Sequence, residues 1–143
     1  MALKQISIFL ENRKGRLAEV TGVLAAAGVN IRALSLADSS DFGLLRIIPD
    51  KPDKCLAALK ENRFMAQVTD VIALEVEDKP GGLNLILTIC DKNGINIEYM
   101  YATVEKSRDN AIVIFKTDDY ARTAKILGEN GVNIADDRIL KNL

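Results

Sequence analysis

The feature that most constrains this chain is an internal repeat. Residues 77–83 (EDKPGGL) align with residues 11–17 (ENRKGRL), and residues 94–97 (GINI) align with residues 28–31 (GVNI) at the same offset of 66 residues. Self-similarity at a fixed offset is typical of a structure built from repeated units. The 143 residues are therefore expected to fold as two copies of one small unit.

The two copies differ in length at one place. Beyond residue 50 the offset is 68 residues, so that residues 129–130 align with residues 61–62, both Glu-Asn. The change of two residues falls within residues 35–43, where a polar run of two Asp and two Ser at 38–41 predicts a turn. Turns accept insertions at a small cost in free energy, so this difference supports the repeat.

Each copy is predicted to begin with a strand followed by a helix. Apolar residues alternate along the first segment and then recur at the spacing of one helix face. Gly28 and Gly94 are expected to end the helices, because glycine readily takes the left-handed conformation there. The alternating residues are Ile6, Ile8, Leu10, Ile72, Leu74 and Val76, and those at helical spacing are Leu17, Val20, Leu24, Ala27, Leu83, Ile86 and Cys90.

Each copy is predicted to continue with a hairpin, a second helix and a last strand. Asp50 and Asp118 stand where they could cap the second helices. The expected hairpin strands are 29–37 with 44–48 and 95–104 with 111–116, the helices 52–62 and 120–130, and the last strands 67–71 and 132–140. The fold class is therefore α+β, with two ferredoxin-like βαββαβ repeats side by side, each an antiparallel sheet with both helices on one face.

No linker is expected between the copies. We assign residues 1–70 to the first domain and residues 71–143 to the second. The last strand of the first copy and the first strand of the second overlap in the sequence. One long or kinked strand through residues 68–76 is therefore expected to serve both copies.

Simple alternation of faces along the second strand of each copy predicts which side chains share a face. An open sheet face that carries apolar residues is usually covered, so we expect a homodimer that buries it. On this pattern Leu34 and Leu36 lie opposite Ile31, Met100 and Val104 lie opposite Ile97, and Tyr99 and Tyr101 share the face of Ile97.

Composition excludes several functional classes. The 19 Lys and Arg nearly cancel the 20 Asp and Glu, which argues against nucleic acid and membranes as partners. The chain has no His and only two separated Cys, so we expect no metal site, no cofactor and no catalytic residue. Unpaired Cys and the lack of a signal-peptide pattern or a long apolar run predict a cytoplasmic protein.

The repeated loop between the first strand and the first helix is the best candidate binding site. Free N–H groups at a helix start suit a carboxylate or phosphate, and Gly15 or Gly81 lets a ligand approach the backbone. The side chain of Asn12 or Asp78 can accept hydrogen bonds from an ammonium group. Together these groups describe a pocket for an α-amino acid. The alternative interpretation is that Asn12 and Asp78 only cap the helices.

The loop motif resembles that of a known family. Residues 78–83 (DKPGGL), followed by GINI at 94–97, are similar to the signature of ACT domains, which are small βαββαβ ligand-binding modules that regulate amino-acid metabolism. The first copy resembles it through residues 12–17 and 28–31, so the resemblance covers almost the whole chain twice. Lys14 stands where the second copy has the family's Pro80, so the two sites need not be equivalent.

The resemblance implies a binding site at the interface of two paired ACT domains, formed by the first loop and the start of the second strand. It implies a regulatory protein that senses a small amino acid and passes its occupancy to a partner, such as a metabolic enzyme. The implied ligand-binding residues are Asn12, Gly15, Arg16, Leu17, Asn30 and Ile31 in the first copy and Asp78, Gly81, Gly82, Leu83, Asn96 and Ile97 in the second.

Two other functional classes stay open. A structural or assembly module would use the ACT-like copies for oligomerisation alone. An acylphosphatase-like enzyme has the same βαββαβ order and needs a phosphate-binding loop with a positioned Arg and Asn. Only the first copy offers a partial match to it, in Arg13, Lys14, Arg16 and Asn30. Since the chain lacks a general base or an activated nucleophile, we expect no enzymatic activity.

Overall fold

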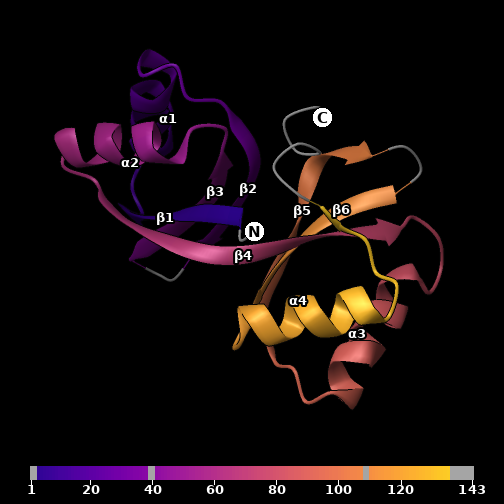
Figure 1. The fold of residues 1–143 in the computed structure, drawn as a ribbon. Coiled ribbons are helices and arrows are strands. Elements are labelled where there is room, and N and C mark those ends of the chain that lie inside the picture. The colour runs from indigo at the N-terminus through magenta and orange to yellow at the C-terminus, as the bar shows by residue number, and fades with distance from the viewer. Residues whose placement is uncertain (1–2, 39–40, 108–109, 136–143) are drawn as a thin grey trace. The chain divides into compact units, whose positions relative to one another are not determined.

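The computed structural model describes residues 3–38, 41–107 and 110–135, and the chain divides into two compact units. The first unit is Lys4–Thr69, and the second is Asp70–Leu143 together with Met1–Leu3. Each unit is a layer of strands covered by two helices (Figure 1).

The first unit follows the expected βαββαβ order. Its strands are antiparallel where β1 meets β3 and where β3 meets β2, and the strand order is β2-β3-β1-β4. The elements are β1 (Leu3–Glu11), α1 (Arg16–Ala26), β2 (Ile31–Asp38), β3 (Phe42–Pro49), α2 (Pro52–Glu61) and β4 (Met65–Glu77). This order of strands and helices confirms the predicted ferredoxin-like class.

The second unit repeats the arrangement from the later part of β4. Its strand order is β7-β4-β6-β5, again antiparallel. The elements are α3 (Gly82–Lys92), β5 (Ile97–Ser107), β6 (Asn110–Thr117), α4 (Tyr120–Glu129) and β7 (Ile134–Ala135). The predicted last strand, 132–140, is therefore seen only as β7, and its residues 136–140 lie outside the described residues.

The strand shared by the two copies is present as expected. β4 is one strand of 13 residues, and the boundary between the units falls inside it, between Thr69 and Asp70. Alternation along its second part places Ile72, Leu74 and Val76 in the core of the second unit. No loop separates the copies.

Each unit has its own apolar core between the sheet and the two helices. In both cores alternate residues of the first strand meet the inner faces of both helices, which places the helices on one side of the sheet. The first core includes Ile6, Ile8, Leu10, Val20, Leu24, Leu45, Ile47, Cys55, Leu59 and Phe64. The second includes Ile72, Leu74, Val76, Ile86, Cys90, Ile95, Val113, Phe115 and Leu127.

A β-bulge at the same place in both copies overturns the predicted faces of the second strands. In β2, Ile31 pairs with Pro49 but Ala33 pairs with Ile48, so one extra residue is accommodated at Arg32. In β5 the register shifts in the same way between Ile97 and Tyr99. One extra residue moves every later side chain of the strand to the other face.

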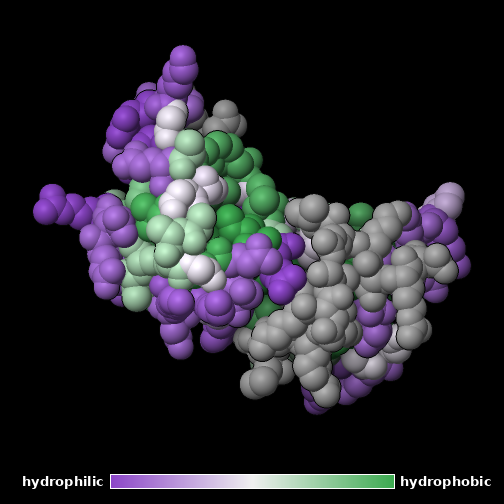
Figure 2. Space-filling view, turned by 90° about the horizontal axis from the view of Figure 1, so that it is seen from above, coloured by the Kyte–Doolittle hydropathy of each residue, from purple (hydrophilic) through white to green (hydrophobic). Residues whose placement is uncertain are grey.

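Leu34 and Leu36 therefore lie on the helix side of the sheet and not opposite Ile31. They pair with Ile47 and Leu45, which are core residues, and paired residues share a face. Because β2 is at the sheet edge, both leucines remain about half exposed, at 49% and 48%. In the view of Figure 2, apolar surface of the first unit is bordered by hydrophilic side chains.

The second copy shows the same correction. Met100 pairs with the core residue Phe115 and so lies on the helix side. Tyr99 and Tyr101 pair with Lys116 and Ile114 on the opposite face, away from Ile97. The side chain of Val104 is outside the described part. Leu34, Leu36 and Met100 therefore do not belong to the open sheet face that the homodimer was expected to bury. The homodimer itself stays a prediction.

The predicted helix caps are shifted or absent. The Asp50 carboxylate accepts a hydrogen bond from the Asn30 N–H at 2.9 Å instead of capping α2, which begins after Lys51 with no side-chain cap. In the second unit the cap of α4 is Asp119, one residue after the predicted Asp118, and its Oδ1 accepts from the Arg122 N–H at 3.1 Å.

Within the described part of the chain, no helix is long and apolar enough to cross a membrane.

Candidate functional site

The loops before α1 and α3 have the geometry expected of an anion-binding helix start. Each helix is preceded by a glycine in the left-handed region, Gly15 with φ 90° and Gly81 with φ 86°. A side chain at either position would be strained by this φ, which accounts for glycine in both copies. Gly28 and Gly94 take the predicted left-handed conformation at the helix ends, with φ 74° and 66°.

The first turns of both helices are uncapped. The N–H groups of Leu17 and Ala18 in α1, and of Leu83 and Asn84 in α3, make no hydrogen bond to another described residue. Capping by Asn12 and Asp78, the alternative interpretation, is therefore not observed. The exposed Asn12 instead donates its backbone N–H to the carbonyl oxygen of Asp41 at 2.9 Å, and Asp78 is also exposed.

Within a unit, the loop and the start of the second strand lie at opposite ends of the sheet. Glu11, just before the first loop, pairs with Phe42 at the start of β3, whereas Ile31 pairs with Pro49 at its end. The second unit has the same separation, because Glu77 pairs with Asn110 and Ile97 with Thr117. Neither unit alone brings the two predicted parts of the site together.

The predicted residues at the strand starts have local structural contacts. Asn30 is tied to Asp50 in both directions, since its carbonyl also accepts from the Asp50 N–H at 3.0 Å. The carbonyl of Asn96 accepts from the Asp118 N–H at 3.3 Å. Ile31 and Ile97 pack against the edges of the two cores.

The first loop is closed around Arg16. Its guanidinium lies 4.6 Å from the centre of the Phe64 ring and bonds the Glu19 carboxylate at 2.9 Å, which leaves the side chain only 15% exposed. Arg13 pairs with Glu11 at 2.9 Å, so two of the three positive charges of this loop are neutralised by ion pairs. Leu17 stays 43% exposed beside them.

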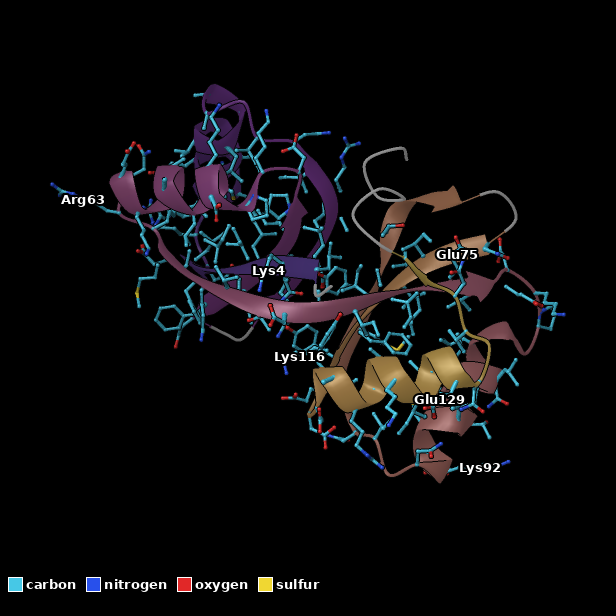
Figure 3. The ribbon with its side chains drawn as sticks, in the orientation of Figure 1. Lys4, Arg63, Glu75, Lys92, Lys116 and Glu129 are labelled. Carbon is cyan, nitrogen blue, oxygen red and sulfur yellow. The ribbon has the colours of Figure 1, made fainter. Side chains whose placement is uncertain are left out.

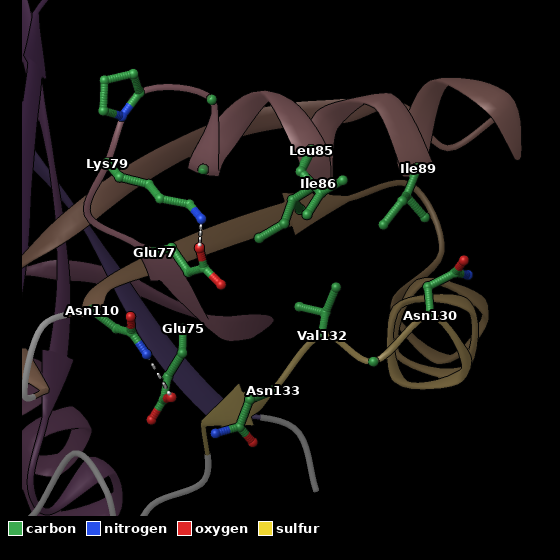
Figure 4. Close-up of a pocket in the computed structure, with 14 residues that line it drawn as sticks. Glu75, Glu77, Lys79, Leu85, Ile86, Ile89, Asn110, Asn130, Val132 and Asn133 are labelled. Carbon is green, nitrogen blue, oxygen red and sulfur yellow. Dashed lines mark hydrogen bonds and ion pairs between the residues drawn. The ribbon is translucent and has the colours of Figure 1, made fainter.

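The second loop opens on a pocket within its own unit (Figure 4). The pocket has a volume of about 640 Å³. Gly81 and Gly82 line it, whereas the other predicted residues of this copy do not, and Leu83 packs against the core. The remaining lining residues are Glu75, Glu77, Lys79, Pro80, Leu85, Ile86, Ile89, Asn110, Asn130, Gly131, Val132 and Asn133.

Gly82 fixes how closely α3 approaches the end of β4. A Cβ built on Gly82 would lie 2.0 Å from the carbonyl oxygen of Glu77, far inside any real contact. The same carbonyl accepts the Lys79 N–H at 2.9 Å. The loop can therefore take this path only with glycine at position 82.

An ion pair stands at the mouth of the pocket. Lys79 Nζ lies 2.6 Å from Glu77 Oε2, and this hydrogen bond raises the pKa of Lys79 above its ordinary value. Deeper in the sheet, the Asn110 amide donates to Glu75 Oε2 at 3.4 Å. Lys79 is thus held in its charged form.

The two cysteines are buried in separate cores. Burial, and then the nearby charge of Asp50, raises the pKa of Cys55 to about 11, and burial also raises that of Cys90. These thiols pack as apolar side chains.

Among the described residues, no group of three or more His, Cys, Asp or Glu could hold a metal ion.

A family model described as an ACT domain pair matches residues 1–143. The chain belongs to the ACT domain family. The ACT resemblance of the two loop motifs is confirmed. A comparison with curated proteins finds no match.

Solved structures similar to this ACT domain pair include one close in sequence. Protein BT0572 from Bacteroides thetaiotaomicron is 39% identical, with 100% of this chain and 98% of that chain covered and a TM-score of 0.93. The regulatory subunit of aspartate kinase from Thermus thermophilus is 16% identical over 88% of this chain and 91% of that chain, with a TM-score of 0.62. The subunit from Thermus flavus is 17% identical over 88% and 90%, with the same TM-score. At such low identity the two kinase subunits show a shared fold.

Sequence reasoning missed most of the pocket in the second ACT domain. Its lining comes from β4, α3, the start of β6 and the connection after α4, which are distant in the sequence. The repeat contained one signal that could have indicated this pocket. The second copy has Gly82 and Leu85 where the first has Arg16 and Glu19, so a large paired cation is replaced by glycine.

Proposed function

We propose that this chain is a regulatory protein that binds a small amino acid at its loop–helix junctions and passes the occupancy to a partner protein. It acts without catalysis of its own. The observation that carries the proposal is the pair of helices that begin on a left-handed glycine with free N–H groups. Its two ACT domains comprise residues 1–70 and 71–143.

The loops supply what an α-amino acid needs. The free N–H groups and the positive end of the helix dipole attract the ligand carboxylate. Side-chain oxygens of Asn12 and Asp78 at the strand ends accept from its ammonium group. The likeness in fold to the aspartate kinase regulatory subunits supports a regulatory role for such a domain pair.

In this proposal the residues at the strand starts bind a ligand that is held by the loop of another ACT domain in an assembly. Asn30 and Ile31, or Asn96 and Ile97, lie at the far end of their own sheet from the loop. They can join a loop only if it belongs to another ACT domain. We propose a homodimer as the assembly that provides such neighbours, and cytoplasmic localisation.

Ligand binding acts by shifting a population of conformations. A ligand that prefers one of two conformations increases its share, and with it the surface offered to the partner. The effect is limited by the difference in affinity, which is typically about 1–3 kcal/mol in allosteric proteins. The partner is proposed to be an enzyme of amino-acid metabolism.

Calorimetric titration of the purified chain with a panel of single amino acids tests the proposal. One or a few related amino acids should bind, and Gly81→Asp should abolish binding at the second loop because its carboxylate repels that of the ligand. Gly81→Asn is the matched control, since Asn tolerates positive φ equally and adds no charge. No binding by any amino acid would contradict the proposal and favour the assembly role.

A further inference from the structure

The two copies treat the space beside the first helix turn in opposite ways. At an offset of 66 residues Gly82 corresponds to Arg16, and Leu85 corresponds to Glu19. At an offset of 68, Val132 corresponds to Phe64. The backbones agree after the second helix, because the N–H groups of Val132 and Phe64 donate to the carbonyls of Leu127 and Leu59, five residues back, at 3.0 and 2.9 Å. At the first helix turn they differ, since a Cβ on Gly82 would lie 2.0 Å from the Glu77 carbonyl oxygen, whereas Arg16 carries a Cβ.

In the first copy this space is filled by the chain itself. The Arg16 guanidinium covers the Phe64 ring at 4.6 Å and is held by Glu19 at 2.9 Å. Phe64 is only 5% exposed. The cation is fixed on one side by the face of an aromatic ring and on the other by a carboxylate.

In the second copy the same three positions leave the space open. Gly82 has no side chain, Val132 is smaller than Phe64, and Leu85 replaces a charged residue with an apolar one that is 63% exposed. The pocket of about 640 Å³ lies there. In Figure 4, Ile86 and Ile89 of α3 point toward Val132 across it.

The open pocket combines an apolar wall with one cation and two carboxylates, Lys79, Glu77 and Glu75. Leu85, Ile86, Ile89 and Val132 form the wall. The Lys79–Glu77 pair stands at one end, where Lys79 and Glu77 are 66% and 61% exposed. A solvated ion pair is worth little and exchanges readily for other partners.

We propose that this pocket of the second ACT domain binds one aliphatic α-amino acid, and that Arg16 closes the equivalent space in the first domain. The proposal rests on the amino-acid binding proposed above and assigns the loop and the class of ligand. The ligand carboxylate lies at the free N–H groups of α3 and also pairs with Lys79, and its ammonium pairs with Glu77, so the zwitterion replaces each partner of the ion pair. The aliphatic side chain lies on the wall of Leu85, Ile86 and Val132.

The charge at the pocket selects against other ligands. At its mouth the pocket offers Lys79 and Glu77 to the two charges of a zwitterion, whereas the second carboxylate of the lining, Glu75, accepts a hydrogen bond from the Asn110 amide. An acidic side chain would be repelled by Glu75, and a basic side chain on the apolar wall would lose its hydration. Glycine would gain nothing from the wall. Branched and unbranched aliphatic amino acids therefore fit this pocket best.

Calorimetric titration with L-leucine tests the proposal, with glycine, L-aspartate and L-lysine as comparison ligands. We expect one leucine per chain and at least about tenfold weaker binding of the comparison ligands. Glycine loses the buried apolar area, and aspartate and lysine place a charged side chain on the apolar wall. Lys79→Ala should weaken leucine binding about tenfold or more, because a charge-assisted contact is lost. Arg13→Ala, which breaks the corresponding ion pair of the first copy, is the matched control and should leave the affinity within about twofold.

Two further variants test the wall and the closed copy. Leu85→Glu restores the residue of the first copy at an exposed position and should weaken leucine binding without unfolding the chain. The triple variant Arg16→Gly, Glu19→Leu and Phe64→Val copies the second pocket into the first domain and should raise the stoichiometry to two. Arg16→Ala alone, which disturbs the fold less, should add a weaker second site.

The outcomes separate the two proposals. If no amino acid binds, both the proposed function and this inference are wrong. If amino acids bind but leucine shows no preference over glycine, or Lys79→Ala and Leu85→Glu leave binding unchanged, the pocket assignment is overturned and the proposed function stands. A stoichiometry that stays at one in both the triple variant and Arg16→Ala would overturn the closure by Arg16.

Discussion

The two ACT domains of this chain agree where a residue fixes the backbone and differ where it fills space. Gly15 and Gly81 have φ of 90° and 86°, and the side chains of Asn62 and Asn130 each donate to the carbonyl four residues back at 2.8 Å. In contrast, the Arg16 side chain covers Phe64, whereas the corresponding Gly82 lines an open pocket. Duplication has therefore preserved the turns and helix ends while it altered one pocket.

One position shows that even a backbone conformation can be kept with a different residue. Arg63 has φ 63°, in the left-handed region, where its counterpart Gly131 has φ 78°. The Arg63 side chain points out to solvent (Figure 3). A non-glycine residue in this region costs about 1–2 kcal/mol, so the rest of the turn holds the conformation. Glycine at 131 avoids this cost at the edge of the pocket.

The largest effect on stability is expected at the glycine that distinguishes the two loops. Gly82→Ala places a Cβ 2.0 Å from the Glu77 carbonyl, so the loop must move, at a cost of about 1–3 kcal/mol in free energy of unfolding. Urea unfolding followed by tyrosine fluorescence measures this in the second domain, since Tyr99, Tyr101 and Tyr120 are the three tyrosines of the chain.

The control for this variant lies in the first domain. Arg16→Ala removes the contact with Phe64 and should cost only about 0.5–1 kcal/mol, because no backbone movement is needed. Hydrogen exchange of the amides of the first core follows it there. Equal losses for Gly82→Ala and Arg16→Ala would mean that the two loops do not differ in the way described.

A smaller difference is expected between the second helices of the two domains. Asp119→Ala removes the side chain that accepts from the Arg122 N–H and should cost about 1 kcal/mol. Lys51→Ala, at the matching position before α2, removes no cap and only the exposed hydrogen bond from Lys51 Nζ to the Gly28 carbonyl, so it should change stability by less than about 0.5 kcal/mol. Urea midpoints of the two variants check this, and a loss as large for Lys51→Ala as for Asp119→Ala would refute it.

The smallest effect at neutral pH concerns Cys55. Its thiol ionises near pH 11 in the folded chain and near the ordinary value of 9.0 in the unfolded chain, so the unfolded state loses its proton first. Stability should therefore fall as the pH rises from about 9 to 11, by up to about 1.4 kcal/mol per pH unit. Below pH 9 both states keep the proton, and no effect is expected.

Urea midpoints at several alkaline pH values, compared between the wild-type chain and Cys55→Ala, isolate this contribution. Lysines and tyrosines titrate in the same range in both proteins, so only the difference reports on the thiol. The variant should lose less stability than the wild type over this range. Parallel pH curves for the two proteins would show that the burial of Cys55 does not act in this way.

The fold could be predicted from the sequence because the repeat doubled every local signal. The strands, helices and left-handed glycines were each marked twice, and the overlap at the join predicted the single strand β4. The faces of β2 and β5 could not be predicted, because a bulge changes the alternation without a distinctive residue at Arg32 or Glu98. The predicted cap of α2 was wrong for a local reason, because the Asp50 carboxylate accepts from the Asn30 N–H instead of from the helix.

The candidate site was predicted only in part. Both loops and their glycines were found, because glycine at a helix start has a direct conformational cause. The apolar wall could not be found, since Leu85 and Val132 meet only after α4 has returned the chain to β4. In the first loop the Arg16 side chain packs on the Phe64 ring. The positive charge of Arg16 therefore fills space between side chains and is not offered to an anion.

The single strand β4 has a consequence for how this gene product can vary in length. The two extra residues of the second copy lie inside the edge strand β5, where the register shifts by two residues between Ala102 and Lys106, and not in the predicted turn, because an edge strand absorbs an insertion locally as a bulge. In β4, one inserted residue would move Ile72, Leu74 and Val76 off the core face of the second domain. Insertions and deletions at the join are thus confined to pairs of residues or to bulges, and relatives should keep an almost invariant spacing there.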